Sequence, residues 1–185
     1  MYLRLSPDEE SIKDIFVSFF DAECSIERIR NAEESGFDAT AWERFMETGG
    51  PGMCLPESCG GGGADLTTAA IVANLLGTYV APIPFIEHVV AARLLASLDQ
   101  NNANLPRLAT GEMIASIALQ SLRDSTNAIV PAGAIANYII GLRGEEIVVA
   151  ENTTSASPLR NTANLPIARH NFDDAMVIAS GDEAH

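Results

Sequence analysis

The hydrophobic pattern of the sequence changes once, near Thr110-Gly111, and this change limits the possible folds more than any other feature. Before it, apolar residues recur at helical spacing, as over residues 12–20. After it, short apolar runs alternate with Gly, Asn and Asp, which is typical of strands. Helices followed by strands favour an α+β fold over alternating βαβ units. We therefore expect an all-helical domain at residues 1–110 and a small β-sheet or barrel-like domain at residues 111–185.

Capping signals predict where the helices begin. Ser6, with Pro7 and Glu9 after it, has the pattern of a capping box, and Thr40 has the same pattern with Glu43. Asp65 is expected to cap a buried helix. The remaining helices are expected over residues 24–34, 40–46, 66–79 and 85–98, and the strands over 113–119, 135–142, 147–150 and 175–179.

The balance of charge excludes two classes of partner. The chain of 185 residues carries 25 acidic against 11 basic side chains, a formal net charge of −14. Nucleic acid and anionic membrane surfaces are bound by clustered Lys and Arg, so we expect neither as a partner. The longest strongly apolar stretch, Leu66–Ile86, is interrupted by Asn, Gly and Pro, and it falls short of a membrane span.

The N-terminus and the cysteines indicate a cytoplasmic protein. Residues 1–10 turn acidic too early for a secretory signal or a transit peptide. Cys24, Cys54 and Cys59 are an odd number without Cys-x-x-Cys spacing, and the histidines fit no metal-binding pattern. We therefore expect reduced thiols and no metal site.

Four consecutive glycines, Gly60–Gly63, raise the question of phosphate binding. A P-loop would have Gly-Lys-Ser/Thr at the start of the next helix, whereas Ala64-Asp65 stands there and puts a carboxylate where phosphate would lie. A structural loop that lets two helices approach closely is the better interpretation. His88, beside Glu87, is expected to be solvated or satisfied in place rather than catalytic.

Four ordered segments carry a family signature. They are Phe37-to-Gly50 with Trp42, the loop Pro56-Glu57-Ser58-Cys59-Gly60-Gly61-Gly62-Gly63, the helical stretch 69–76, and Pro84-Phe85 with a leucine-rich helix that leads into residues 105–119. In this order and at these separations they resemble the acyl-CoA dehydrogenases, a family of flavoenzymes. The resemblance covers residues 5–120 well and the remainder loosely.

The resemblance implies a fold and a chemistry. In this family a helical domain and a β domain precede a C-terminal helix bundle, FAD accepts a hydride, and a carboxylate of the bundle takes a proton from the acyl-CoA thioester. The chain ends at His185, about where that bundle would begin, so the resemblance implies no catalytic residue within it. We therefore expect an FAD-dependent acyl-CoA dehydrogenase of fatty acid or steroid degradation that is inactive as an isolated chain. It would act as a homo-oligomer, or as a heteromer with a chain that supplies the bundle.

The resemblance also implies where cofactor and substrate lie. The candidate contacts to FAD are Leu119, Gln120 and Ser121, on the strand that enters the β domain. The candidate lining of an acyl cavity is Tyr79, Phe85 and Val89, with packing in the core as the alternative for each. Gln120-Ser121 stands where the family usually has part of a Thr-Glu-Pro motif, which lies against the flavin ring and the thioester.

Three functions stay open at this stage. The first is a portion of an FAD-dependent acyl-CoA dehydrogenase, as a truncated chain or as one subunit of a heteromer. The second is a non-catalytic structural subunit of a heteromeric acyl-CoA dehydrogenase, which the missing Thr-Glu-Pro motif favours. The third is a related monooxygenase or oxidase with the same fold, which would consume oxygen when its flavin is reduced.

Overall fold

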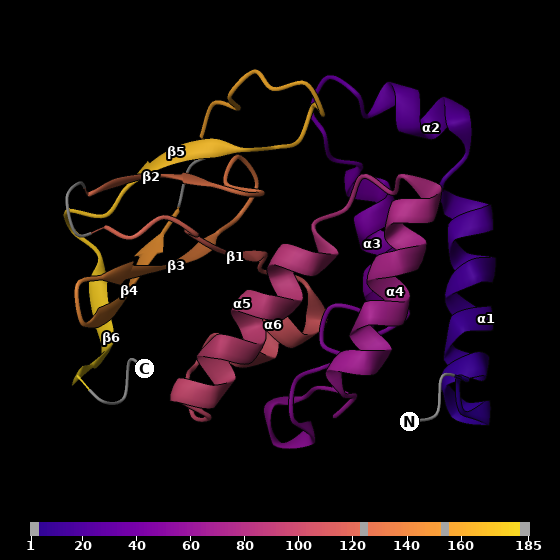
Figure 1. The fold of residues 1–185 in the computed structure, drawn as a ribbon, viewed down its shortest axis with the longest axis horizontal. Coiled ribbons are helices and arrows are strands. Elements are labelled where there is room, and N and C mark those ends of the chain that lie inside the picture. Colours follow the sequence, from indigo (N-terminus) through magenta and orange to yellow (C-terminus); the bar gives the residue numbers. More distant parts are fainter. Residues whose placement is uncertain (1–3, 123–125, 153–155, 182–185) are drawn as a thin grey trace.

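Helices and strands are separated along the chain. The computed structural model describes residues 4–122, 126–152 and 156–181. The helices are α1 (Pro7–Glu23), α2 (Ile26–Asn31), α3 (Ala39–Glu47), the short 3-10 helix η1 (Glu57–Cys59), α4 (Leu66–Tyr79), α5 (Phe85–Leu98) and α6 (Leu105–Thr110). The strands are β1 (Ala115–Ile117), β2 (Asn127–Val130), β3 (Tyr138–Arg143), β4 (Glu146–Glu151), β5 (Ala168–Asn171) and β6 (Met176–Ser180). In Figure 1, α1 to α4 lie at one end and the strands at the other, which confirms the predicted α+β fold.

Two of the predicted helix starts are confirmed. The Ser6 hydroxyl accepts a hydrogen bond from the Glu9 N–H at 3.3 Å, while the Glu9 carboxylate accepts one from the Ser6 N–H at 2.6 Å. This reciprocal pair is a capping box. Asp65 caps α4 by accepting from the N–H of Thr68 at 2.8 Å. Each cap satisfies N–H groups that a helix leaves unpaired in its first turn.

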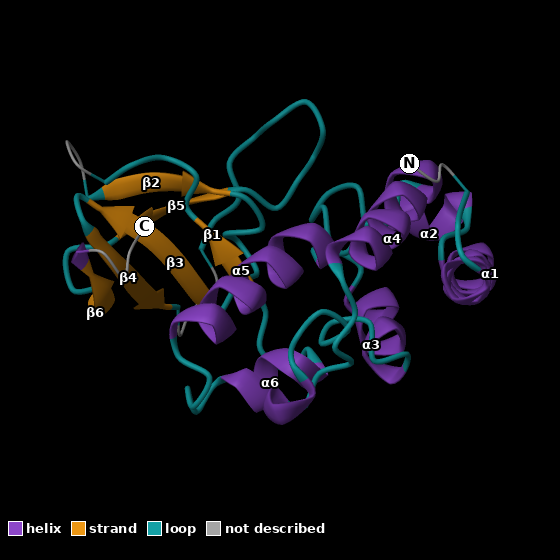
Figure 2. Cartoon of the chain, turned by 60° about the horizontal axis from the view of Figure 1, so that its bottom comes forward, coloured by secondary structure: helices purple, strands orange, loops and turns teal. Residues whose placement is uncertain are grey.

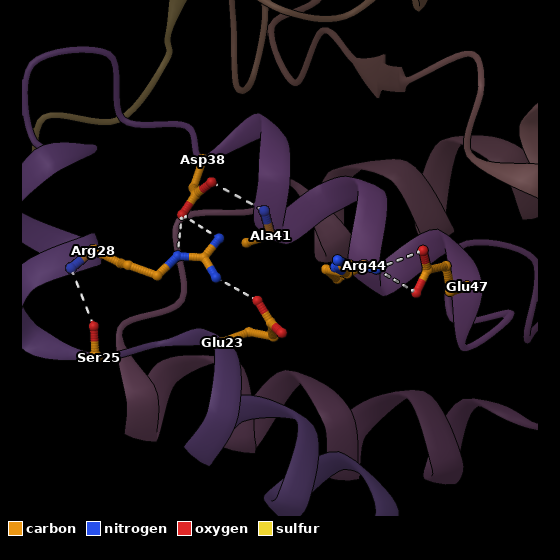
Figure 3. A network of polar contacts seen from close by, with 7 residues as sticks. All are labelled: Glu23, Ser25, Arg28, Asp38, Ala41, Arg44 and Glu47. Atoms are coloured by element: carbon orange, nitrogen blue, oxygen red, sulfur yellow. Dashed lines mark hydrogen bonds and ion pairs between the residues drawn. The ribbon is translucent and has the colours of Figure 1, made fainter.

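Helix α3 is capped by Asp38, so the prediction of a capping box at Thr40 is wrong. One oxygen of the Asp38 carboxylate accepts from the N–H of Ala41 at 2.9 Å. The other oxygen accepts from Arg28 at 2.9 and 3.1 Å, and the same guanidinium binds Glu23 at the end of α1 (Figure 3). A charged cap thus holds the ends of three helices together, which an uncharged Thr cap would not do.

Helix α5 connects the helical layer to the strands. Toward the helices, the ring of Phe85 packs edge-on against Phe45 at 5.4 Å. Toward the strands, Ala91 and Ala92 are fully buried beside Ala115 of β1, where small side chains let helix and strand approach closely. Figure 2 shows α5 running from the helical end of the molecule to the edge of the sheet.

The strands form two sheets. A four-stranded sheet has the order β1-β3-β4-β6, and a two-stranded sheet pairs β2 with β5. β1 and β3 run parallel, and the other neighbours are antiparallel. β1, β3, β4 and β6 correspond to the four predicted strands. The elements that were not predicted from the residue pattern are η1, α6, β2 and β5.

The glycine run 60–63 folds back on the residues before it. Its four N–H groups donate to backbone carbonyls, those of Glu57, Pro56, Gly52 and Leu55, at 2.9 to 3.1 Å. A Cβ on Gly61 would lie 2.3 Å from the Leu55 carbonyl oxygen, which leaves room for glycine alone. With its N–H groups used internally, the run forms a structural loop rather than a phosphate cradle. The close approach is between loop backbones and not, as expected, between two helices.

Three general features of the described residues bear on function. No described helix is both long and apolar enough to cross a membrane. Within residues 4–122, 126–152 and 156–181, no group of three or more His, Cys, Asp or Glu side chains could hold a metal ion. Cys24, Cys54 and Cys59 are all buried and free.

Candidate functional site

An apolar cleft of about 180 Å³ lies between helix α5 and the end of strand β1. Its lining is Ile86, Glu87, Val90, Ser116, Ile117, Leu119 and Pro131. The cleft brings Leu119, a predicted cofactor contact, next to the helix that carries the predicted acyl contacts Phe85 and Val89. It is therefore the candidate functional site.

Helix α5 presents its less buried side to the cleft. Ile86 and Val90 are 46% and 49% exposed, and residues four apart share one face of a helix. Phe85 and Val89 precede them by one residue each and are turned into the core, 1% and 4% exposed. The helix is apolar on both sides because one side packs in the core and the other forms the cleft wall.

The segment that follows β1 stays attached to β3 at two points, with extra residues between them. The N–H of Ala118 donates to the Ile140 carbonyl at 2.8 Å, and the N–H of Leu122 donates to the Leu142 carbonyl at 2.9 Å. The two donors are four residues apart along this segment, whereas the two acceptors are only two residues apart on β3. The extra length makes residues 119–121 bulge out of the sheet.

This bulge brings the three predicted cofactor contacts together at the surface. Leu119 is 79% exposed, and Gln120 and Ser121 are exposed beside it. The side-chain carbonyl of Gln120 accepts from the N–H of Ile129 at 3.2 Å, which ties the bulge to β2. That they bind FAD stays a prediction.

A hydrogen bond joins two residues of the cleft lining, Ser116 and Pro131. Ser116 is fully buried, and its hydroxyl donates to the carbonyl of Pro131 in the turn after β2. The next residue, Ala132, has a φ of 52°, which is uncommon for a residue other than glycine. The turn that carries Pro131 is therefore held in a specific shape against β1.

Glu87 is the acidic side chain of the cleft. It is half-buried, and burial raises the pKa of its carboxyl, with a hydrogen bond from its own backbone N–H acting in the opposite direction. Removal of a carboxylate from water disfavours its charged form. The cleft therefore contains one carboxyl group in surroundings that are otherwise mostly apolar.

His88 lies on the other side of α5 and is satisfied in place, as predicted. Its Nδ1 accepts from the N–H of Ala115 at 3.2 Å, so the ring proton is on Nε2, which donates to the Leu108 carbonyl at 3.0 Å. Burial lowers the pKa of this imidazole to about 4, against the hydrogen bond to Leu108, which raises it. His88 is thus a neutral link between α5, α6 and β1.

Tyr79 lies away from the cleft, at the interface of α1 and α4. Its ring stacks on Phe20 at 5.7 Å, and a hydrogen bond to the Asp21 carboxylate is the main cause of the raised pKa of its hydroxyl. The structure therefore does not bring Tyr79 together with Leu119. The role of Tyr79, Phe85 and Val89 in an acyl cavity stays a prediction.

Sequence reasoning missed the three residues of α5 that line the cleft. Ile86 and Val90 belong to a helix that is apolar on most sides, so periodicity does not say which side is open. Glu87 offered a signal, because it is a carboxylate within an otherwise apolar helical stretch.

Residues 6–112 match the family model of the acyl-CoA dehydrogenase N-terminal domain. The acyl-CoA dehydrogenase IpdE2 of Mycolicibacterium smegmatis is 27% identical over 154 residues, which are 82% of this chain and 47% of that protein. The chain therefore spans about half the length of this relative.

Two solved structures are similar to this fold over all or nearly all of the chain. The ChsE4-ChsE5 complex from Mycobacterium tuberculosis superposes with a TM-score of 0.86 at 20% identity, over 100% of this chain and 60% of that chain. An acyl-CoA dehydrogenase complexed with FAD from Bacillus anthracis gives a TM-score of 0.77 at 21% identity, over 94% of this chain and 36% of that one. At these identities the similarity shows a shared fold.

Proposed function

Because this chain belongs to the acyl-CoA dehydrogenase family, we propose that it forms the flavin-facing wall and part of the acyl cleft of an FAD-dependent acyl-CoA dehydrogenase. The match to the family model covers more than half of the chain, residues 6–112. The observation that carries the proposal is the cleft, which is lined both by Leu119 and by the exposed side of α5. The same proposal includes the binding of FAD and of acyl-CoA by these residues. It also includes the division of the chain into two domains near residue 110.

The groups at the bulge fit a flavin. Leu119 offers an exposed apolar side chain for a flat ring, and the Gln120 amide and the Ser121 hydroxyl offer hydrogen-bonding groups beside it. When bound, FAD supplies the acceptor for the hydride from the β carbon of the acyl group. In this proposal the bulge supports the ring, and the apolar cleft keeps water away from the acyl carbons.

The carboxylate that removes the α proton is proposed to lie outside residues 1–185, in a further segment or in a partner chain. The ChsE4-ChsE5 structure has the same fold and is a complex of two different components, which supports the proposal of a heteromer for this chain. Acyl-CoA as the substrate is proposed from the family.

A direct test is to purify the chain in the assembly that it forms in its native cells and to record its flavin spectrum before and after anaerobic addition of acyl-CoA. We expect a flavin spectrum that bleaches on addition. Leu119→Asp should lower the FAD affinity about tenfold or more, because a carboxylate replaces the apolar contact beside the ring. Leu165→Asp, at a loop residue that is 50% exposed, is the matched control and should leave FAD affinity unchanged. An assembly without flavin would contradict the proposal.

The second candidate is a non-catalytic structural subunit of a heteromeric acyl-CoA dehydrogenase. The observation that favours it is Gln120-Ser121 at the position of the family's flavin-contacting motif. This candidate predicts that the chain copurifies with a dehydrogenase chain, that neither FAD nor acyl-CoA contacts it, and that Leu119→Asp leaves the activity of the assembly unchanged.

A further inference from the structure

Two polar side chains, Glu87 and Ser116, line a cleft that is otherwise apolar. The other lining residues are Ile86, Val90, Ile117, Leu119 and Pro131. A cleft for a plain hydrocarbon chain needs no polar side chain, and a carboxylate held among apolar groups costs free energy. The polar groups of the cleft therefore need a physical reason.

Ser116 has a structural reason. Its hydroxyl donates to the carbonyl of Pro131, and the residue is 0% exposed. It fastens β1 to the turn after β2 and presents no surface to a molecule in the cleft. Glu87 is left as the polar side chain that can meet such a molecule.

Glu87 has only a partial structural reason: it lies in the first turn of α5, where a negative charge is favourable near the helix N-terminus, but no ion pair of the described residues includes it. The neighbouring His88 is turned into the core, where both ring nitrogens are bound to backbone groups. Burial raises the pKa of the Glu87 carboxyl, and the hydrogen bond that counteracts it comes from its own backbone N–H. A carboxyl group has about four acceptor positions, so most of its hydrogen-bonding capacity is unused.

We infer that Glu87 binds a hydroxyl group of the acyl substrate, so that the enzyme takes hydroxylated acyl-CoA thioesters in preference to plain ones. This inference rests on the proposed function, because it assigns the cleft to the acyl group. A hydroxyl donates to a carboxylate and accepts from a carboxylic acid, so Glu87 binds it in either state. An acyl group without the hydroxyl leaves the carboxyl desolvated and unpaired. Binding sites discriminate most strongly against a substrate that leaves their buried polar groups unpaired.

The size of the cleft limits where the hydroxyl lies. A volume of about 180 Å³ corresponds to about six water molecules and holds a short segment of an acyl group. Leu119 and Glu87 line this same small volume, so the hydroxyl is expected within a few carbons of the carbons that react beside the flavin. Six-carbon thioesters with a hydroxyl on carbon 4, 5 or 6 are therefore suitable probes.

The test compares hexanoyl-CoA with 4-, 5- and 6-hydroxyhexanoyl-CoA on the purified native assembly. Dissociation constants are measured by calorimetry, and flavin reduction is followed separately. We expect at least one hydroxylated probe to bind about tenfold or more tightly than hexanoyl-CoA, as for a hydrogen bond to a charged group. Glu87→Leu should abolish this preference and bind hexanoyl-CoA at least as well, whereas Glu87→Gln should keep part of it, because an amide still donates and accepts. Glu43→Leu, at an exposed residue of α3, is the matched control and should keep the full preference.

The outcomes separate the inference from the proposed function. Equal affinity of the wild type for all four probes, with normal flavin reduction, would overturn the inference and leave the proposed function intact. Loss of flavin reduction in Glu87→Gln with unchanged binding would make Glu87 the proton acceptor, which would overturn the inference together with the proposed location of that carboxylate outside residues 1–185. If no probe binds and the flavin is not reduced, the proposed function fails and the inference fails with it. Far-UV circular dichroism shows that each variant is folded.

Discussion

A single buried residue, His88, makes the stability of the chain depend on pH. Its pKa is about 4 in the folded chain and about 6.5 in the unfolded chain. Between these values the unfolded chain binds a proton that the folded chain does not, so the free energy of unfolding falls as pH falls from about 6.5 toward about 4. We predict a loss of about 2 kcal/mol between pH 7 and pH 5 from this residue. Urea denaturation at the two pH values measures it.

The variant His88→Gln isolates this effect. It removes the titrating ring, so the variant is expected to be less stable at pH 7 but to lose about 2 kcal/mol less than the wild type on going to pH 5. Glu87, whose pKa is raised, and Asp65 and Asp173, whose pKa values are lowered, titrate in both proteins and cancel in the difference. Parallel pH profiles for wild type and variant would show that His88 is not the cause.

At the scale of elements, the glycine loop is constrained by the backbone around it. A Cβ on Gly61 would lie 2.3 Å from the Leu55 carbonyl oxygen and 2.6 Å from the Gly52 carbonyl oxygen. Backbone atoms cannot rotate aside as side chains do, so Gly61→Ala should lower the free energy of unfolding by about 1–3 kcal/mol. Gly77→Ala is the matched control, because no atom beyond its chain neighbours and the adjacent backbone of α4 lies within 4 Å of its Cβ position, and alanine favours helix. It should be neutral or stabilising by up to about 1 kcal/mol, and denaturation midpoints of the two variants test the contrast.

The elements that local patterns predicted are those with strong local signals. α1 and α4 begin at side-chain caps that can be recognised in the sequence, and β3 and β4 are continuous apolar runs. β5 has one buried residue in four, Ala168, and exists because it pairs with β2, which is about 40 residues away along the chain. α6 is six residues long, too short for a periodic signal.

Only part of the candidate site was predictable from the sequence. Leu119 was found through the resemblance at the entry to the β part. Ile86, Glu87 and Val90 were not found, because the open side of α5 is decided by where β1 and the turn at Pro131 lie. Contacts between distant segments decide such positions, and no window of the sequence contains them.

At the scale of the whole molecule, the helical and β parts share one core. A single cluster of buried side chains includes Phe16 and Trp42 of the helices together with Ile139 and Phe172 of the β part. The Trp42 indole N–H also donates to the Gly111 carbonyl at 3.0 Å, at the point where the helices end. A shared core of this kind makes the two parts depend on each other for stability, whether or not they are separate domains by sequence.

We therefore predict that the chain unfolds in one cooperative transition. Trp42 is the single tryptophan, so its fluorescence reports on the helical part, while far-UV circular dichroism reports on the whole chain. Ile139→Ala, at a fully buried residue of β3, should lower the free energy of unfolding by about 2–5 kcal/mol and shift the midpoints of both signals together. Leu142→Ala, at a residue of the same strand that is 37% exposed, should shift both much less. If Ile139→Ala moved the dichroism midpoint and left that of Trp42 fluorescence in place, the two parts would be unfolding independently. The shared core would then not couple them.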